Sequence, residues 1–181
     1  FPLYKLVTAA LYPLRFFAYA GLYFVFANNP KQQSGISRWL FLVILIIAIT
    51  GLLQYIFMPN VAFLSAFDWD DHYYRLIGTF LDPGFTGAIL VLGLILIFTN
   101  FKNFLTLLLV YVALALTYSR ASYLMYLVSF GLIAFYKKSL KTLIIAALIL
   151  GLTILILPKT AGEGTKLSRE NSITARINNW K

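Results

Sequence analysis

Long apolar stretches separated by short polar connections constrain this chain more than any other feature of its sequence. Hydrophobic residues make up 61% of the 181 and charged residues 12%, against roughly 45–50% and 25% in an ordinary soluble domain. A single hydrophobic core in a protein of this length cannot hide so much apolar surface from water, so a lipid bilayer is the expected solvent. The sequence therefore predicts an all-α fold, a polytopic transmembrane helical bundle of about six spans. The expected spans are 11–27, 39–58, 84–99, 103–119, 121–136 and 141–157.

The charged residues fall into two groups that alternate along the chain. The connections after the first, third and fifth spans are basic and contain no acid; their cations are Lys31, Arg38, Lys102, Lys137, Lys138 and Lys141. All six acids lie in residues 59–83 and 158–181, namely Asp68, Asp70, Asp71, Asp82, Glu163 and Glu170. Because an excess of Lys and Arg in short loops marks the cytoplasmic side, segments 59–83 and 158–181 are expected to be external.

The domain organisation is expected to be simple. Residues 1–181 are predicted to form a single membrane domain, with residues 158–181 as a polar outer-face segment. Because the chain starts at Phe1 and stops inside an expected helix, we expect a fragment of a longer chain. The sequence has no cysteine, which excludes disulfides, thiol nucleophiles and cysteine-ligated metals.

A tight connection joins the fourth and fifth spans, with Ser119 and Arg120 at its centre in the run LTYSRASY. Two apolar helices turn there with few polar residues, so Arg120 is expected at the outer edge of the bilayer. An arginine deep in a membrane costs roughly 2.5–3.5 kcal/mol on insertion scales. It is therefore expected to reach the interface or a binding partner, and a simple interfacial anchor remains an alternative.

Residues 75–87, RLIGTFLDPGFTG, combine an arginine and an aspartate around a short apolar run. Asp82 followed by Pro83 is typical of a helix start, because aspartate caps helix N-termini and proline is tolerated in the first turn. A segment that dips into the membrane and returns at the outer surface fits this pattern. An ordinary loop that leads into a capped helix is the alternative.

A third arginine lies near the end of the chain. Arg176 and Trp180 are one helical turn apart in SITARINNWK, a pattern that an interfacial amphipathic helix explains equally well. However, Arg75, Arg120 and Arg176 are all expected on the same outer side. Guanidinium groups bind phosphate oxygens in forked pairs and stay charged at physiological pH. The three arginines together predict a site for an anionic lipid head group, above all a diphosphate.

The only histidine, His72, lies in the acidic run DWDDHYYR. With Asp68, Asp70 and Asp71 it could ligate a metal or supply a base. No metal-ligand spacing is present, and a solvated acidic loop explains the same residues. No metal site is predicted, and His72 is kept only as a weak candidate for a general base.

The ordered set of these motifs resembles the O-antigen ligase and polymerase family of bacterial envelope enzymes over about residues 70–181. The residues that carry the resemblance are Arg75, Gly78, Asp82, Pro83, Gly87, Thr117, Ser119, Arg120, Ala121, Ser172, Arg176 and Trp180. The resemblance implies a multi-pass protein of the bacterial inner membrane. Its implied reaction is a metal-independent, inverting transfer of a glycan from undecaprenyl diphosphate to an acceptor hydroxyl, on a lipid A core, a glycan or a protein, at the outer face.

The resemblance also implies roles for particular residues. Arg75, Arg120 and Arg176 would hold the diphosphate, and Asp82 and Ser119 would support the site. No cofactor and no nucleic acid are expected. The family's large outer loop, which carries a functional histidine, would follow Lys181, so the general base is expected beyond this chain and the fragment is expected to be inactive alone.

Two other classes of protein fit part of the pattern. A transporter or flippase for an anionic lipid or solute needs the same arginines and the same bilayer, but its ionisable groups are expected near the membrane midplane. A structural membrane subunit explains the hydropathy but not the one-sided arginines. Glycan transfer is the function that the sequence favours.

Overall fold

The structure, a computed structural model, describes residues 13, 17, 30–67 and 73–158. The chain divides into two compact units, residues 1–40 and 41–181. The first unit contributes the beginning of helix α2 (Pro30–Phe57) to the described part. The second contains the rest of α2 and all later elements, and the functional site lies within it. The prediction of a single membrane domain over residues 1–181 stays a prediction.

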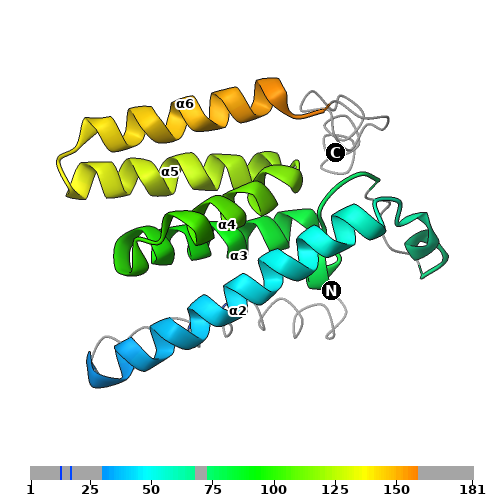
Figure 1. Cartoon of the computed structure of the whole chain (residues 1–181), viewed down its shortest axis with the longest axis horizontal. Coiled ribbons are helices and arrows are strands. Elements are labelled where there is room, and N and C mark those ends of the chain that lie inside the picture. Colours follow the sequence, from blue (N-terminus) through cyan, green and yellow to red (C-terminus); the bar gives the residue numbers. More distant parts are fainter. Residues whose placement is uncertain (1–12, 14–16, 18–29, 68–72, 159–181) are drawn as a thin grey trace, which may run out of the picture. The chain divides into compact units, whose positions relative to one another are not determined.

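Helices make up all the regular structure of the described ranges, which contain no strand (Figure 1). After α2 come α3 (Pro83–Leu96), α4 (Phe104–Leu116), α5 (Arg120–Tyr136) and α6 (Leu140–Ile156). A π-helical turn, Ile97–Phe101, continues α3, and two 3₁₀ turns, Ala62–Phe67 and Gly78–Phe80, lie between α2 and α3. The all-α prediction is confirmed. Five of the six expected spans correspond to α2–α6. The remaining one, the first span at 11–27, falls almost wholly outside the described residues.

Two helical stretches in the described ranges are long and apolar enough to cross a membrane, Gly35–Phe57 and Pro83–Phe101. The helices α4, α5 and α6 are apolar but have only 13, 17 and 17 residues. A helix of 17 residues is about 25 Å long, against about 30 Å of hydrocarbon in a bilayer. Two helices in the described ranges could thus cross a membrane, and the expected six spans stay a prediction.

Side-chain caps define where three of the helices begin. The Asp82 carboxylate accepts a hydrogen bond of 2.5 Å from Phe85 N at the start of α3, with Pro83 as the first helical residue. Asn103 caps α4 by accepting from Leu105 N, and Ser119 caps α5. These bonds satisfy main-chain donors that have no partner inside a helix. The helix start predicted at Asp82 and Pro83 is confirmed.

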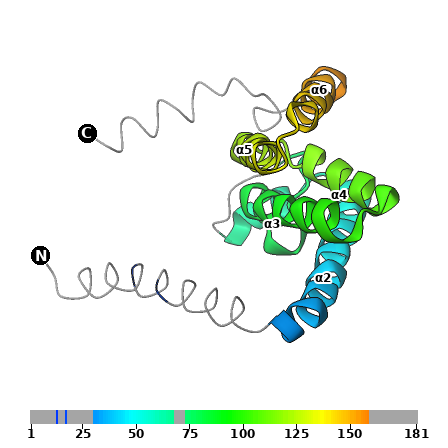
Figure 2. The same ribbon diagram turned by 90° about the vertical axis from the view of Figure 1, so that its left-hand side faces the viewer.

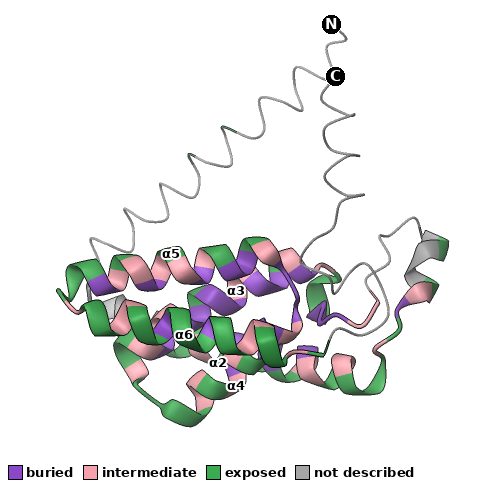
Figure 3. Cartoon of the chain, turned by 90° about the horizontal axis from the view of Figure 1, so that it is seen from above, coloured by how far each residue is buried: buried purple, intermediate pink, exposed green. Residues whose placement is uncertain are grey.

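Helix α3 is at the centre of the second unit and carries more buried residues than any other helix (Figure 3). It packs against α4 and α5, and α5 in turn packs along α6 (Figures 1 and 2). Glycines make the closest approaches possible: a Cβ at Gly87 would collide with the Ser122 side chain, and one at Gly93 would collide with Ile44. Small residues at helix contacts are typical of membrane bundles, where close van der Waals packing drives association.

The connections of the second unit gather at two opposite ends. Arg75 and Leu76 bond to residues at the end of α4, and Tyr118 Oη donates to Pro158 O after α6 at 2.9 Å. We call this the arginine end, because Arg75 and Arg120 lie there. At the other end, which we call the lysine end, the Lys137 ammonium lies 4.6 Å from the centre of the Phe98 ring, and Lys102 follows that same π-helical turn.

Candidate functional site

The site at the arginine end is built on the segment that precedes α3. Leu76 N donates to Leu116 O at 2.8 Å, and Tyr74 N donates to Pro59 O at 2.9 Å. Leu76 and Ile77 are completely buried. Leu76 and Ile77 therefore lie inside the fold, against the last turn of α4, whereas Phe80 and Leu81 further along the run are exposed.

Arg75 is buried, with 5% of its surface exposed. Its Nε donates to Thr117 O at 3.0 Å and its Nη2 donates to Tyr118 O at 3.3 Å. These carbonyls follow the last turn of α4, where the helix dipole is negative and cations are stabilising. Arg75 thus fixes the connection between α4 and α5, a structural role that the sequence analysis did not assign to it.

Gln54 ties the same segment to α2. Its Oε1 accepts from Ile77 N at 3.0 Å and from Gly78 N at 3.3 Å, and its Nε2 donates to Met58 O at 3.0 Å. The sequence analysis missed this residue. The available signal was a carboxamide in the apolar second half of α2, since a polar group at such a position is expected to have a partner.

Thr86 on α3 completes the support of this segment. Its hydroxyl is buried and donates to Ile77 O at 2.5 Å, and its methyl group lies where a Cβ on Gly78 would come within 3.2 Å. Gly78 has a φ of +60°, and Tyr74, Leu81 and Tyr118 also have positive φ between 49° and 55°. Left-handed non-glycine residues cost about 1–3 kcal/mol each and cluster at functional sites.

The N-termini of α3 and α5 meet beside this segment. Ser122 Oγ lies 2.8 Å from Ser119 Oγ and donates to Gly84 O at 3.3 Å. Ser119 and Ser122 are both buried, and Arg120, the first residue of α5, is half-buried. Helix N-termini carry partial positive charge. The Asp82 carboxylate offsets it at α3, so the N-terminus of α5 and the two arginines supply the positive potential here.

The structure brings together four of the residues that the sequence predicted for the site: Arg75, Asp82, Ser119 and Arg120. Arg176 and His72 lie outside the described residues, so their predicted roles stay predictions. Asp82 is engaged as the cap of α3, which agrees with its expected role in holding the turn. The residues Gln54, Thr86 and Ser122 belong to the same polar network and were not predicted.

The polar network gives the arginine end a definite chemistry. Buried hydroxyls, main-chain carbonyls and Arg75 hold the connection rigidly, and Arg120 stands at its edge on a helix N-terminus. Such an arrangement suits an anion such as phosphate, because both the guanidinium and the helix end favour negative charge. The only carboxylate in the described ranges, Asp82, already accepts from a main-chain amide.

No family of proteins, curated protein or solved structure was found to match this chain.

Proposed function

We propose that the chain is the central membrane part of a glycan transferase, an O-antigen ligase or polymerase, that takes its glycan from undecaprenyl diphosphate. The arginine end is the diphosphate site in this proposal, with Arg120 as its principal ligand and Arg176 as a further one. The acceptor is a hydroxyl on a lipid A core, a glycan or a protein. The ordered motif set is the basis for choosing this family among membrane proteins.

One observation carries the proposal: Arg120 lies on the N-terminus of α5 where the N-terminus of α3 meets it through the Ser122 bond to Gly84. A diphosphate carries concentrated negative charge, which a guanidinium and the N-terminus of α5 can share. Arg75 supports the site indirectly. It bonds to the carbonyls of Thr117 and Tyr118, which precede Ser119 and Arg120 in the chain. Hydrogen bonds hold this network without a ligand, so we expect the site to be organised before the ligand binds.

The proposed reaction is the one that the family resemblance implies. The acceptor oxygen attacks the anomeric carbon of the glycan and loses its proton to a base beyond the described residues. The bond between that carbon and the diphosphate oxygen breaks, and undecaprenyl diphosphate leaves with the electron pair. Negative charge develops on the leaving diphosphate, and preorganised positive groups that face it lower the barrier. Inversion at the anomeric carbon follows from a single displacement.

The membrane setting is part of the proposal. The outward faces of α2, α5 and α6 carry many exposed leucine, isoleucine, valine and phenylalanine side chains, which suits lipid contact. The proposed arrangement has six spans in the bacterial inner membrane, with the lysine end cytoplasmic and the arginine end external. It agrees with the positive-inside rule, because Lys102, Lys137 and Lys138 share one end.

Single-cysteine labelling tests this orientation, since the chain has no native cysteine. In intact cells, a membrane-impermeant maleimide is expected to label Thr165→Cys but not Ser34→Cys. After the membrane is permeabilised, both are expected to react. Labelling of Ser34→Cys in intact cells, with Thr165→Cys protected, would reverse the orientation and remove the arginine end from the outer face.

Transport is the competing function, and the helices themselves weigh against it. The described helical residues 41–57, 83–101, 104–116, 121–136 and 142–156 contain no Asp, Glu, Lys, Arg or His. A path for an anion through the membrane is expected to place ionisable groups near the midplane. Because the charged residues lie only toward the two ends of these helices, a reaction at the membrane surface is favoured over transport through the membrane.

Reconstitution of the full-length protein tests the proposed reaction. Vesicles that contain the protein, an undecaprenyl-diphosphate-linked glycan and an acceptor are expected to release undecaprenyl diphosphate and to yield a glycosylated acceptor. A chelator is expected to leave the rate unchanged, because the arginines and the N-terminus of α5 neutralise the leaving group. A failure to form product with any of the three acceptor classes would overturn the proposal, and a loss of rate with chelator would overturn its metal-independent form.

A further inference from the structure

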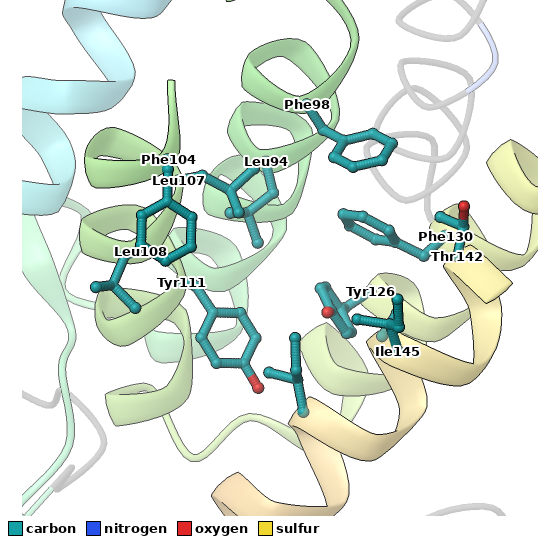
Figure 4. A pocket seen from close by; sticks show the side chains of 12 residues that line it. Leu94, Phe98, Phe104, Leu107, Leu108, Tyr111, Tyr126, Phe130, Thr142 and Ile145 are labelled. Atoms are coloured by element: carbon teal, nitrogen blue, oxygen red, sulfur yellow. The ribbon is translucent and has the colours of Figure 1, made fainter. Parts of the chain in front are cut away.

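A separate cavity lies near the lysine end, between α3, α4, α5 and α6 (Figure 4). Its volume is about 570 Å³, within the roughly 300–1,000 Å³ that is typical of ligand pockets. Its wall is almost entirely apolar and includes Leu94, Leu107, Tyr126, Phe130 and Ile145. The cavity therefore suits a hydrocarbon chain.

A second, more polar pocket of about 300 Å³ adjoins this cavity and shares Phe98, Phe104 and Leu107 with it. Lys102 and Lys137 line the second pocket together with Asn103. The Lys137 ammonium lies over the Phe98 ring at 4.6 Å from its centre, so an aromatic residue that lines both spaces also contacts one of the cations. A basic mouth thus opens next to an apolar interior.

No carboxylate in the part of the chain that the structure describes lies near this mouth. The sequence has no Asp or Glu between residues 84 and 157. In the described ranges the only carboxylate, Asp82, caps the opposite end of α3. The lysine end is therefore positive on its own and complementary to an anionic group.

We propose that the two pockets together bind one anionic phospholipid. Its phosphate lies between Lys102 and Lys137, and one acyl chain fills the cavity between α4 and α6. Basic pockets between membrane helices on the cytoplasmic side are known to take acidic lipid head groups, and the proposed orientation places the lysine end on that side. A phospholipid combines an anionic head with a long apolar chain. This site is at the opposite end from the proposed diphosphate site and does not depend on glycan transfer.

Native mass spectrometry of the full-length protein tests the head-group part. The protein, equilibrated with equal amounts of phosphatidylglycerol and phosphatidylcholine of the same acyl chains, is expected to retain one phosphatidylglycerol. The double variant Lys102→Gln/Lys137→Gln is expected to bind phosphatidylglycerol about 30-fold more weakly. This assumes that each lysine contributes about 1 kcal/mol and that about 1.4 kcal/mol corresponds to a tenfold change in affinity. The matched control is Lys138→Gln/Lys141→Gln, which removes two exposed lysines of the same end that do not line these pockets.

Three results would overturn the head-group part: equal retention of phosphatidylcholine, unchanged binding in the Lys102/Lys137 variant, or an equal loss in the control. The acyl-chain part is tested on the unmodified protein, so misfolding of a variant cannot obscure it. Phosphatidylglycerol with a photoreactive group along one acyl chain is expected to crosslink to residues 104–111 and 142–149. Crosslinks elsewhere only, or a protein segment found in the cavity in their place, would show that lipid is not the occupant.

Discussion

Replacement of Arg120 by alanine in the full-length protein is expected to lower glycan transfer at least about 10²–10³-fold, which is the usual effect of removing one preorganised donor from a developing negative charge. The reason is electrostatic. Arg120 is half-buried on the N-terminus of α5, beside the N-terminus of α3, and in the proposed site its charge faces the leaving diphosphate. The rate is measured as undecaprenyl diphosphate released from vesicles, and protein abundance and thermal unfolding temperature are expected to stay close to those of the unmodified protein.

The control for this substitution is Arg38→Ala, which removes an exposed arginine from α2 and is expected to leave transfer unchanged. Arg120→Lys keeps the charge but not the forked geometry, so a partial loss of rate is expected. Full activity of Arg120→Ala at normal abundance would remove Arg120 from the site and leave the proposed function without its principal ligand.

Arg75 is expected to behave differently, because its substitution should lower stability. In Arg75→Met, the carbonyls of Thr117 and Tyr118 lose the donors that Nε and Nη2 now provide. A buried group left without its hydrogen bond costs roughly 1–3 kcal/mol, so two of them predict a loss of about 2–6 kcal/mol. We expect a clearly lower unfolding temperature in detergent and faster proteolysis in the connection between α4 and α5.

Two comparisons separate the structural role of Arg75 from a role in binding. Gln54→Leu removes a different support of the same segment, the acceptor for Ile77 N and Gly78 N, and is expected to lower the unfolding temperature in the same direction. Arg38→Met serves as the exposed control. An Arg75→Met protein that unfolds at the normal temperature but no longer binds the lipid-linked donor would contradict the structural role and make Arg75 a direct ligand of the diphosphate.

The helices were predictable because each follows from a local property of the chain. The expected stretch 121–136 corresponds to α5, Arg120–Tyr136, and 141–157 corresponds to α6, Leu140–Ile156. Aspartate and proline marked the start of α3 for a local reason, since the cap bond joins Asp82 to Phe85. The extent of α3 was harder to predict: it continues as a π-helical turn to Phe101, because nothing in an apolar run distinguishes one helical hydrogen-bond pattern from another.

The candidate site was predictable only in part. Arg75 and Arg120 were expected on one side from the distribution of charge, and they do lie at the same end of the second unit. Gln54, Thr86 and Ser122 were missed because their partners are 23, 9 and 38 residues away along the chain. A single polar residue in an apolar helix does not reveal which main-chain group it will bond.

The sequence by itself determined that the described chain is helical, that apolar side chains dominate its surface, and that its cations separate into two groups. These properties depend on composition and on spacing over a few residues, so they can be read from neighbouring positions. Only the tertiary structure decided that Arg75 bonds to the end of α4, that the N-termini of α3 and α5 meet through Ser122, and that a cavity lies between α4 and α6. Those contacts join segments that are far apart in the sequence, and their energies depend on which helix faces pack together. The close helix contacts at Gly87 and Gly93 decide which faces these are.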